Sequence, residues 1–312
     1  MTIANRITQM LGVEYPIVQA PMGWIARAQL ASAVCNAGGM GIIETSSGEL
    51  DAIKGEMAKM RTLTTKPFGV NVALAFVRDP GIVNFIIDQG VKFVTTSAGD
   101  PQKIVGPLKA AGLTVFHVVP SLKTALRAVE CGVDGLVVEG GEGGGFKNPK
   151  EVASMVLLPL VCEKVAVPVI AAGGMVDGRT MAAAFMLGAE GIQMGTRMVS
   201  AAESPVHMNW KNAILAAQET DTVFLNRFGP GPALRALRTE KTTRMEKDPP
   251  PNALAEFGRA TDLYFGGDME SSIALSGQVA GRIDSIKPVA QIIAETVQEF
   301  EETIAKMAKR YA

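Results

Sequence analysis

The chain has 312 residues, of which 47% are hydrophobic and 20% charged, and its 30 Lys and Arg residues nearly balance 31 Asp and Glu residues. This composition predicts a folded protein with a sizeable core, because disordered chains contain fewer apolar residues. A net charge of -1 argues against a nucleic-acid-binding scaffold, which normally needs a strong basic excess. Three cysteines and two histidines leave little material for a disulfide framework or a zinc site, so we expect no metal.

The distribution of apolar residues argues against a membrane-spanning or a secreted protein. Charged residues interrupt every apolar run before it reaches the length of a membrane span, and the first residues lack the order of a signal peptide. We therefore expect a reduced, cytoplasmic protein with no membrane partner. The oligomeric state stays open, with a homodimer as one alternative.

Short apolar runs recur along the first two thirds of the chain, each followed by a segment with helical spacing. This alternation predicts parallel strands with helical crossovers, and eight units favour a (β/α)8 TIM barrel over a doubly wound sheet. The expected strands are 17–19, 41–43, 68–72, 93–96, 114–119, 135–138, 168–172 and 191–194, and helices are expected at 26–37, 82–89, 122–131 and 180–187.

Many of the 33 glycines stand directly after these helices, as in Asn36–Gly41 and Met186–Gly191. A glycine there can adopt the left-handed conformation that ends a helix, because it carries no Cβ. We interpret these glycines as structural.

The pattern changes after the eighth strand. Residues 203–270 contain helical pieces, the break Phe228–Pro232 and the stiff segment Asp248–Asn252, which together predict a small helical lid inserted after strand eight. The division predicted is therefore a barrel at 1–202, the lid at 203–270 and a C-terminal segment at 271–312. An apolar stripe at 287–312 predicts a final helix packed on the barrel wall.

Two glycine-containing loops follow the seventh and eighth strands, the positions where barrels often bind phosphate. Backbone N–H groups can approach phosphate oxygens closely where glycine removes the side chain. We expect phosphate contacts from Ala172, Gly173, Gly174, Met194, Gly195 and Thr196, although tight strand-to-helix turns would have the same sequence.

Further motifs end the first and third strands, at Gln19–Gly23 and Gly69–Asn71. Together with Ala171–Gly174 and Met194–Arg197, they closely resemble the flavin-dependent barrel family of nitronate monooxygenases. That family includes flavin-type enoyl-acyl-carrier-protein reductases and NADH:quinone reductases. The resemblance extends from about Arg6 to Ser276–Gly281.

The resemblance implies that FMN lies across the barrel mouth. The segment Pro21, Met22 and Gly23 would run along the isoalloxazine ring, and Asn71 would hydrogen-bond to it. The phosphate would be held by the two loops described above, and Gln278 would approach the flavin from the C-terminal segment.

The densest glycine cluster follows the sixth strand and includes Gly144, where a planar ligand could approach closely. In the family this loop ends in Gly-Gly-His-x-Gly, and its histidine is the catalytic acid or base. Here Phe146 stands at the histidine position and Asn148 at the following glycine, and phenylalanine cannot transfer a proton. Phe146 could form an apolar wall beside the flavin or pack the loop. A proton would then come from Glu142, Lys147, a lid residue or water.

Each of the other titratable residues near the predicted barrel mouth has two possible roles. His117 is a candidate proton donor or a satisfied strand histidine. His207 is interpreted as structural or as a lid contact. Glu139, at the end of strand six, could contact the ribityl chain or substrate, or could cap the loop.

Four basic residues three apart, Arg235, Arg238, Lys241 and Arg244, would share one face of a lid helix. The ordinary interpretation is a solvated face. The alternative is that Arg235 and Arg238, with Lys147, contact substrate phosphates of coenzyme A, acyl carrier protein or NADP.

The sequence therefore predicts an FMN-dependent oxidoreductase. NADH or NADPH, bound transiently, would reduce the flavin, which would reduce an unsaturated acyl thioester or a quinone. The alternatives are oxidation of nitronates with oxygen, starting from the anion so that no base is needed, and a non-catalytic flavin-binding sensor or partner protein.

Overall fold

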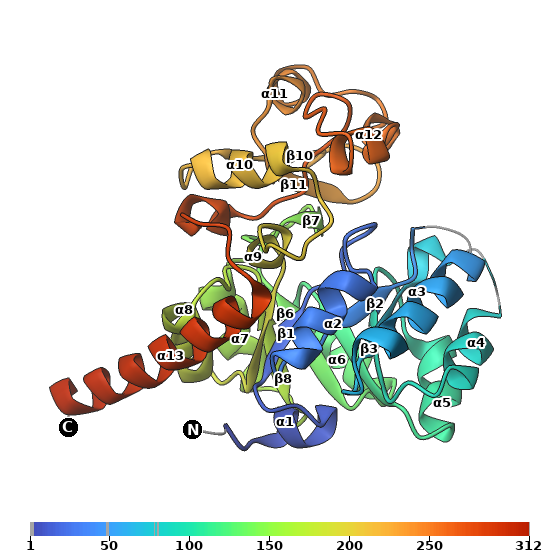
Figure 1. Cartoon of the computed structure of the whole chain (residues 1–312), viewed down its shortest axis with the longest axis vertical. Coiled ribbons are helices and arrows are strands. Elements are labelled where there is room, and N and C mark those ends of the chain that lie inside the picture. Colours follow the sequence, from blue (N-terminus) through green and yellow to red (C-terminus); the bar gives the residue numbers. More distant parts are fainter. Residues whose placement is uncertain (1–2, 48–49, 78, 80, 312) are drawn as a thin grey trace.

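The computed structural model describes residues 3–47, 50–77, 79 and 81–311, and a barrel of eight parallel strands forms its centre (Figure 1). Hydrogen bonds run in parallel register from β2 through β3, β4, β5, β6, β8 and β9 to β1, and a bridge between Val18 and Met40 links β1 back toward β2. The TIM barrel prediction is confirmed, and each expected strand matches within one residue. The strands are β1 (Ile17–Gln19), β2 (Ile42–Glu44), β3 (Gly69–Ala73), β4 (Phe93–Ser97), β5 (Thr114–Val119), β6 (Gly135–Glu139), β8 (Val169–Ala172) and β9 (Gly191–Met194).

Helices surround the barrel strands, and several end at a glycine as the sequence predicts. Gly90, Gly112, Gly132 and Gly188 have φ angles of 67°, 79°, 86° and 98°, in the left-handed region. The helices are α1 (Arg6–Leu11), α2 (Ala28–Asn36), α3 (Leu50–Leu63), η1 (Leu74–Phe76), α4 (Ile82–Asp88), α5 (Gln102–Ala110), α6 (Leu122–Glu130), α7 (Ser154–Cys162), α8 (Gly178–Met186) and α9 (Thr196–Val199).

Apolar side chains fill the amino end of the barrel. Ile7 and Leu11 of α1 pack against a buried cluster that includes Phe93 and Phe116, whose rings meet edge to face at 5.4 Å. In Figure 1, α1 lies below the strands and the lid lies beyond their opposite ends. The carboxyl ends of the strands therefore face the lid, which is the end where barrel enzymes place their active sites.

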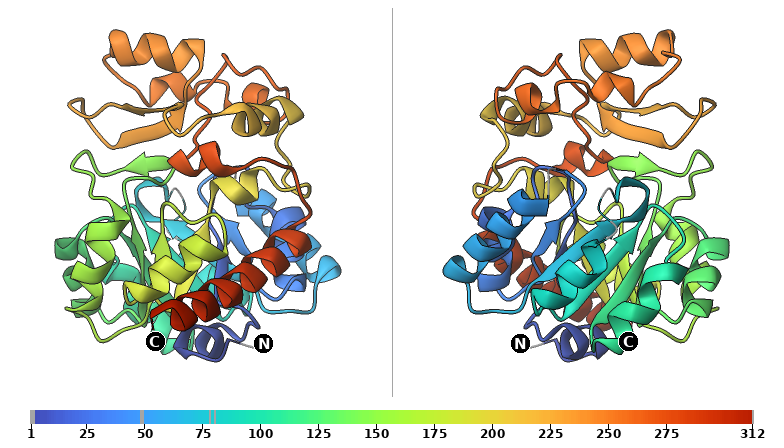
Figure 2. Two further views of the ribbon diagram at one scale, coloured as in Figure 1. Left: turned by 90° about the vertical axis from the view of Figure 1, so that its left-hand side faces the viewer. Right: turned by 90° about the vertical axis from the view of Figure 1, so that its right-hand side faces the viewer.

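The lid contains strands as well as helices. Residues 226–232, which include the predicted break, turn the chain between two antiparallel strands, β10 and β11. A third strand, β7 (Gly145–Lys147), comes from the glycine-rich loop after β6 and pairs with β11 (Figure 2). The predicted helical lid therefore also contains strands that the sequence did not predict. The lid elements are α10 (Met208–Ala216), β10 (Thr222–Leu225), β11 (Ala233–Leu237), α11 (Glu240–Lys247), η2 (Ala255–Phe257) and α12 (Ala260–Tyr264).

After η3 (Gln278–Arg282) the chain returns to the barrel wall as α13 (Val289–Tyr311). This helix packs along α8, where the rings of Phe185 and Phe300 are 5.0 Å apart. None of the helices in the described residues combines the length and apolar character needed to cross a membrane.

Gly178 is required where α8 meets α13. A Cβ at Gly178 would lie 2.2 Å from the backbone nitrogen of Phe300, whereas a Cβ at Gly55 in α3 would meet no atom within 4 Å. We predict that Gly178→Ala lowers the free energy of unfolding by about 2 kcal/mol or more, because backbone must move. The matched variant Gly55→Ala should raise it by about 0.5–1 kcal/mol. Chemical denaturation measures both, and equal stability of the two variants would contradict this packing.

Candidate active site

A cavity of about 850 Å³ lies between the carboxyl ends of the strands and the lid. Loops after β1, β3, β4, β5, β6, β8 and β9 line it, together with lid residues such as Phe257 and Tyr264. Pockets for small molecules typically measure roughly 300–1,000 Å³, so this one has room for a large ligand or for two ligands side by side.

One wall comes from the ends of β1 and β3. Pro21, Met22, Gly23 and Asn71 all line the cavity. Asn71 is 2% exposed, and its Nδ2 donates to the hydroxyl oxygen of Thr95 at 3.0 Å. This bond fixes the direction in which the amide faces.

A second wall comes from the ends of β8 and β9, of which β9 pairs directly with β1. Ala172, Gly173, Gly174, Gly195 and Thr196 line the cavity there. Gly173 has a φ of +80°, and a Cβ on it would lie 2.8 Å from the carbonyl oxygen of Gly140. The Thr196 hydroxyl accepts the N–H of Gly277 at 2.9 Å, which leaves its own proton free to be donated. These features make the wall a cradle of backbone and hydroxyl groups.

Gln193 is a cavity residue that sequence reasoning missed. It is 5% exposed, and its Oε1 is buried without a hydrogen-bond partner among the described residues. A buried amide oxygen without a donor is costly, so this atom is suited to meet a ligand. The signal available in the sequence was a single polar residue at the end of the apolar strand β9.

The glycine-rich loop after β6 forms the wall nearest the lid. Gly144 lines the cavity and lies so close to the C-terminal segment that a Cβ would be 2.6 Å from the carbonyl carbon of Ser276. Phe146 is 39% exposed, and its ring centre is 5.2 Å from that of Phe76 and 5.8 Å from that of Phe257. The three rings, all in the cavity lining, form an aromatic wall shared by barrel and lid.

Five predicted site residues are not in the lining, namely Glu142, Met194, Gln278, Arg235 and Arg238. Glu142 accepts hydrogen bonds from the backbone N–H and hydroxyl of Ser154, the first residue of α7, and so holds the loop to that helix. Met194 is fully buried in the core. Gln278 is exposed on η3, and its backbone N–H, rather than its side chain, bonds to the loop at the carbonyl of Glu142. The Glu142 and Met194 side chains therefore have structural roles, whereas Gln278 contributes its backbone N–H.

The basic series does not form one helix face, so this prediction is wrong. Arg235 lies in β11 and is 6% exposed; its Nε donates to the Gly141 carbonyl at 2.7 Å and its Nη2 pairs with Glu151 at 2.6 Å. Arg238 pairs with Glu246. Neither arginine lines the cavity, and Arg235 instead ties the lid to the glycine-rich loop.

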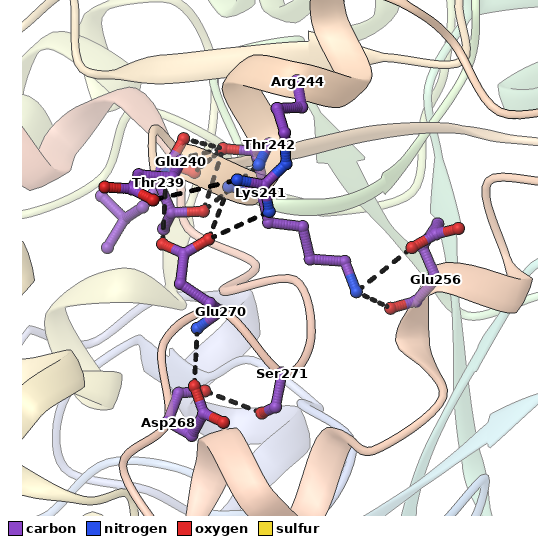
Figure 3. Close-up of polar contacts among 10 residues, drawn as sticks. Thr239, Glu240, Lys241, Thr242, Arg244, Glu256, Asp268, Glu270 and Ser271 are labelled. Carbon is purple, nitrogen blue, oxygen red and sulfur yellow. Dashed lines mark hydrogen bonds and ion pairs between the residues drawn. The ribbon is translucent and has the colours of Figure 1, made fainter.

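The remaining basic residues belong to the lid's internal contacts. In Figure 3, Lys241 reaches Glu256, and the Glu270 carboxylate accepts the backbone N–H groups of Glu240 and Lys241 at the start of α11. An acidic group at this end of a helix stabilises it. The series therefore carries a lid-stabilising role in this structure.

Five titratable side chains line the cavity within the described residues: His117, Glu139, Lys147, Glu151 and Tyr264. Burial lowers the pKa of His117 to about 4, so its imidazole is neutral at neutral pH. Its Nδ1 lies 2.6 Å from the Thr96 hydroxyl oxygen. Burial also raises the pKa of Tyr264, which stays a phenol.

The remaining charged groups are paired. Glu151 meets Arg227 through one oxygen and Arg235 through the other. Glu139, at the end of β6, forms an ion pair with Lys147 of β7. Among the described residues no group of three or more His, Cys, Asp and Glu side chains could hold a metal ion.

Comparison with known proteins shows which family has this sequence and fold. The family model for nitronate monooxygenase matches residues 4–80 and 74–299, which is most of the chain. The chain belongs to the nitronate monooxygenase family. This family implies a flavin, and the chain is an enzyme of the flavin-dependent oxidoreductase type.

Individual relatives differ in their named activities. A Mycobacterium tuberculosis protein named (3aS,4S,5R,7aS)-5-hydroxy-7a-methyl-1-oxo-octahydro-1H-indene-4-carboxyl-CoA dehydrogenase is 39% identical over 79% of this chain and 69% of its own length. A Staphylococcus aureus protein named "Probable nitronate monooxygenase" is 30% identical over 96% and 98%. The solved structure of FabK from Thermotoga maritima has a TM-score of 0.92 and 38% identity, covering 99% of this chain and all of that one.

The low pKa of His117 predicts a pH dependence of stability. Unfolding returns the imidazole to a pKa near 6.5, so between pH 6.5 and 4 the unfolded chain binds a proton that the folded chain does not. The free energy of unfolding therefore decreases as the pH falls through that window. The total decrease due to His117 is about 3 kcal/mol. We expect His117→Gln to lose less stability than the parent between pH 7 and 4, measured by denaturation of the flavin-free proteins. Parallel pH profiles would contradict the burial of a neutral imidazole.

Proposed function

We propose that this chain is an FMN-dependent oxidoreductase that acts at the Cα–Cβ bond of an acyl thioester. In the direction of enoyl reduction, NADH or NADPH would be the reductant. The observation that carries the proposal is the aromatic wall of Phe76, Phe146 and Phe257. It gives the cavity an apolar compartment between barrel and lid, suited to an acyl group. A 39% identical relative is named as dehydrogenase of a CoA thioester.

The residues present fit an FMN. Gly173, Gly174, Gly195 and Thr196 would hold the phosphate, because their backbone N–H groups and the Thr196 hydroxyl border the cavity. Gln193 Oε1, which lacks a partner, would accept a hydrogen bond from the cofactor. Met22 and Asn71 would border the ring on the other wall. When bound, FMN supplies the acceptor and donor of a hydride, which no side chain can be.

The chain's own residues would orient and enclose the substrate. The lid and the aromatic wall would exclude water from the acyl group and hold it against the barrel mouth. The neutral His117 would offer a hydrogen bond but no charge. The basic groups Arg227 and Arg235 are already paired with Glu151, so electrostatic recognition of a substrate phosphate is not assigned to them.

The phosphate assignment predicts a selective effect of Gly195→Ala. A Cβ at Gly195 would meet protein only at 3.7 Å, from the Ala20 side chain, so the fold should tolerate it. A phosphate drawn close to this backbone would be displaced, and we expect FMN affinity to fall about tenfold or more. Fluorescence titration of the flavin-free protein measures it, with Gly106→Ala, which has open space around it, as control. Unchanged affinity in Gly195→Ala would remove this loop from the phosphate site.

The proposed reaction predicts which compounds reduce the bound flavin. Under anaerobic conditions NADH or NADPH should bleach the FMN-loaded protein, and crotonyl-CoA should restore the colour of the reduced protein with formation of butyryl-CoA. Absorbance near the flavin maximum and mass analysis of the thioester follow both steps. Bleaching by a nitronate alone, with no reoxidation by the enoyl thioester, would favour nitronate oxidation instead. Reoxidation by a quinone but not by crotonyl-CoA would favour a quinone reductase.

A further inference from the structure

The cavity lining contains an ion pair that joins the end of β6 to β7. Glu139 ends β6, and Lys147 comes back toward it from β7 on the far side of the glycine-rich loop. Gly143 lies over the pair: a Cβ there would be 2.6 Å from Glu139 Oε1 and 2.7 Å from Lys147 Nζ. Both side chains and Gly143 line the cavity. Because Gly143 has no side chain, the loop can pass close to the ion pair without displacing it.

The two partners are unequally covered. The Lys147 side chain is 4% exposed, whereas that of Glu139 is 25% exposed. The closest contact of the pair joins Glu139 Oε1 to Lys147 Nζ, and no hydrogen bond to Glu139 Oε2 is found in the part of the chain that the structure describes. Lys147 is thus placed to hold the Glu139 carboxylate by charge attraction at the cavity lining.

The other titratable groups of the lining are less suited to accept a proton from carbon. Both oxygens of Glu151 are occupied by guanidinium groups. The Tyr264 phenol keeps its proton, and the buried His117 imidazole is a weak base whose Nδ1 already lies 2.6 Å from the Thr96 hydroxyl oxygen. Phe146, which lies in β7 of the lid sheet, has no transferable proton. Glu139 is the one carboxylate of this lining, among the described residues, with an oxygen available.

We propose that Glu139 is the base that exchanges the proton at Cα of the acyl thioester, and that Lys147 is its positioning residue. This inference rests on the proposed substrate class. In the step, the Cα–H bond breaks, its proton forms an O–H bond with Glu139, and the electron pair stays on the thioester as an enolate. In the reverse direction the protonated Glu139 returns the proton to Cα. The step needs no oxidant, because no electrons leave the thioester.

The test is solvent deuterium exchange at Cα of butyryl-CoA, measured by mass spectrometry in deuterium oxide with FMN-loaded and flavin-free protein. Wild type should catalyse exchange, and Glu139→Gln should lose about 100-fold or more of the exchange rate. Glu139→Asp should recover part of it. The surface variant Glu163→Gln, which is exposed at the end of α7, should exchange like wild type.

Two further readouts separate a chemical role from a structural one. Glu139→Gln should retain bleaching of the flavin by NADH or NADPH, since that half-reaction moves no proton at Cα. Lys147→Met should lower the exchange rate by a smaller factor, and its pH profile should shift. Exchange at the wild-type rate in Glu139→Gln would overturn the assignment. If Glu139→Gln loses exchange and also loses both its FMN and its bleaching by NADH or NADPH, the assignment would likewise be overturned. The residue would then be structural.

The outcome is distinguishable from a failure of the proposed function. If wild type binds FMN but neither exchanges the Cα proton nor reacts with crotonyl-CoA, the thioester itself is the wrong substrate class. If wild type reacts with crotonyl-CoA and Glu139→Gln does so equally fast, the substrate stands and the base lies elsewhere.

Discussion

The pairing of β7 with β11 is the contact on which the cavity depends. A loop with glycine at five of six consecutive positions, 140–145, would have little conformational preference by itself. Its end is nevertheless held, because Gly145–Lys147 forms the third strand of the lid sheet. Arg235 reinforces this pairing by binding both the Gly141 carbonyl and Glu151. Lid and loop are therefore one structural unit above the barrel.

This unit explains why two neighbouring residues face different surroundings. Successive side chains of a strand point to opposite faces, so β7 directs Phe146 and Lys147 in opposite directions. Phe146 joins Phe76 and Phe257 in the aromatic wall, while Lys147 reaches Glu139 beneath Gly143. One short strand thus supplies both the apolar compartment and the ammonium that holds the carboxylate.

The barrel could be predicted from the sequence because its signals are local. Each strand is a short apolar run and several helices end at a glycine, so the order of elements alone gave the eight strands. The lid could not be predicted in the same way. Arg235 has the spacing of a helix face relative to Arg238, but its neighbour across the sheet, Gly145, stands ninety positions earlier. Pairing at that distance leaves no local periodicity to detect.

The candidate site was predictable in part for the same reason. Pro21, Met22, Asn71, Gly173 and Gly195 stand at strand ends, and every strand end of a parallel barrel faces the same rim. Gln193 and the Glu139–Lys147 pair depend on side-chain directions that the sequence does not specify. Glu142 shows the converse case: it stands in the right loop, but its carboxylate binds Ser154 and does not face the cavity.

The central claim is that the acyl thioester lies with its Cα at Glu139, inside the aromatic wall. The most direct test is a crystal structure of the protein with FMN and butyryl-CoA bound. The account predicts the Cα atom within about 3.5 Å of a Glu139 carboxylate oxygen, and the acyl chain against Phe146. An acyl chain bound outside the ring of Phe146, or a Glu139 carboxylate turned away from the thioester toward other groups, would contradict it.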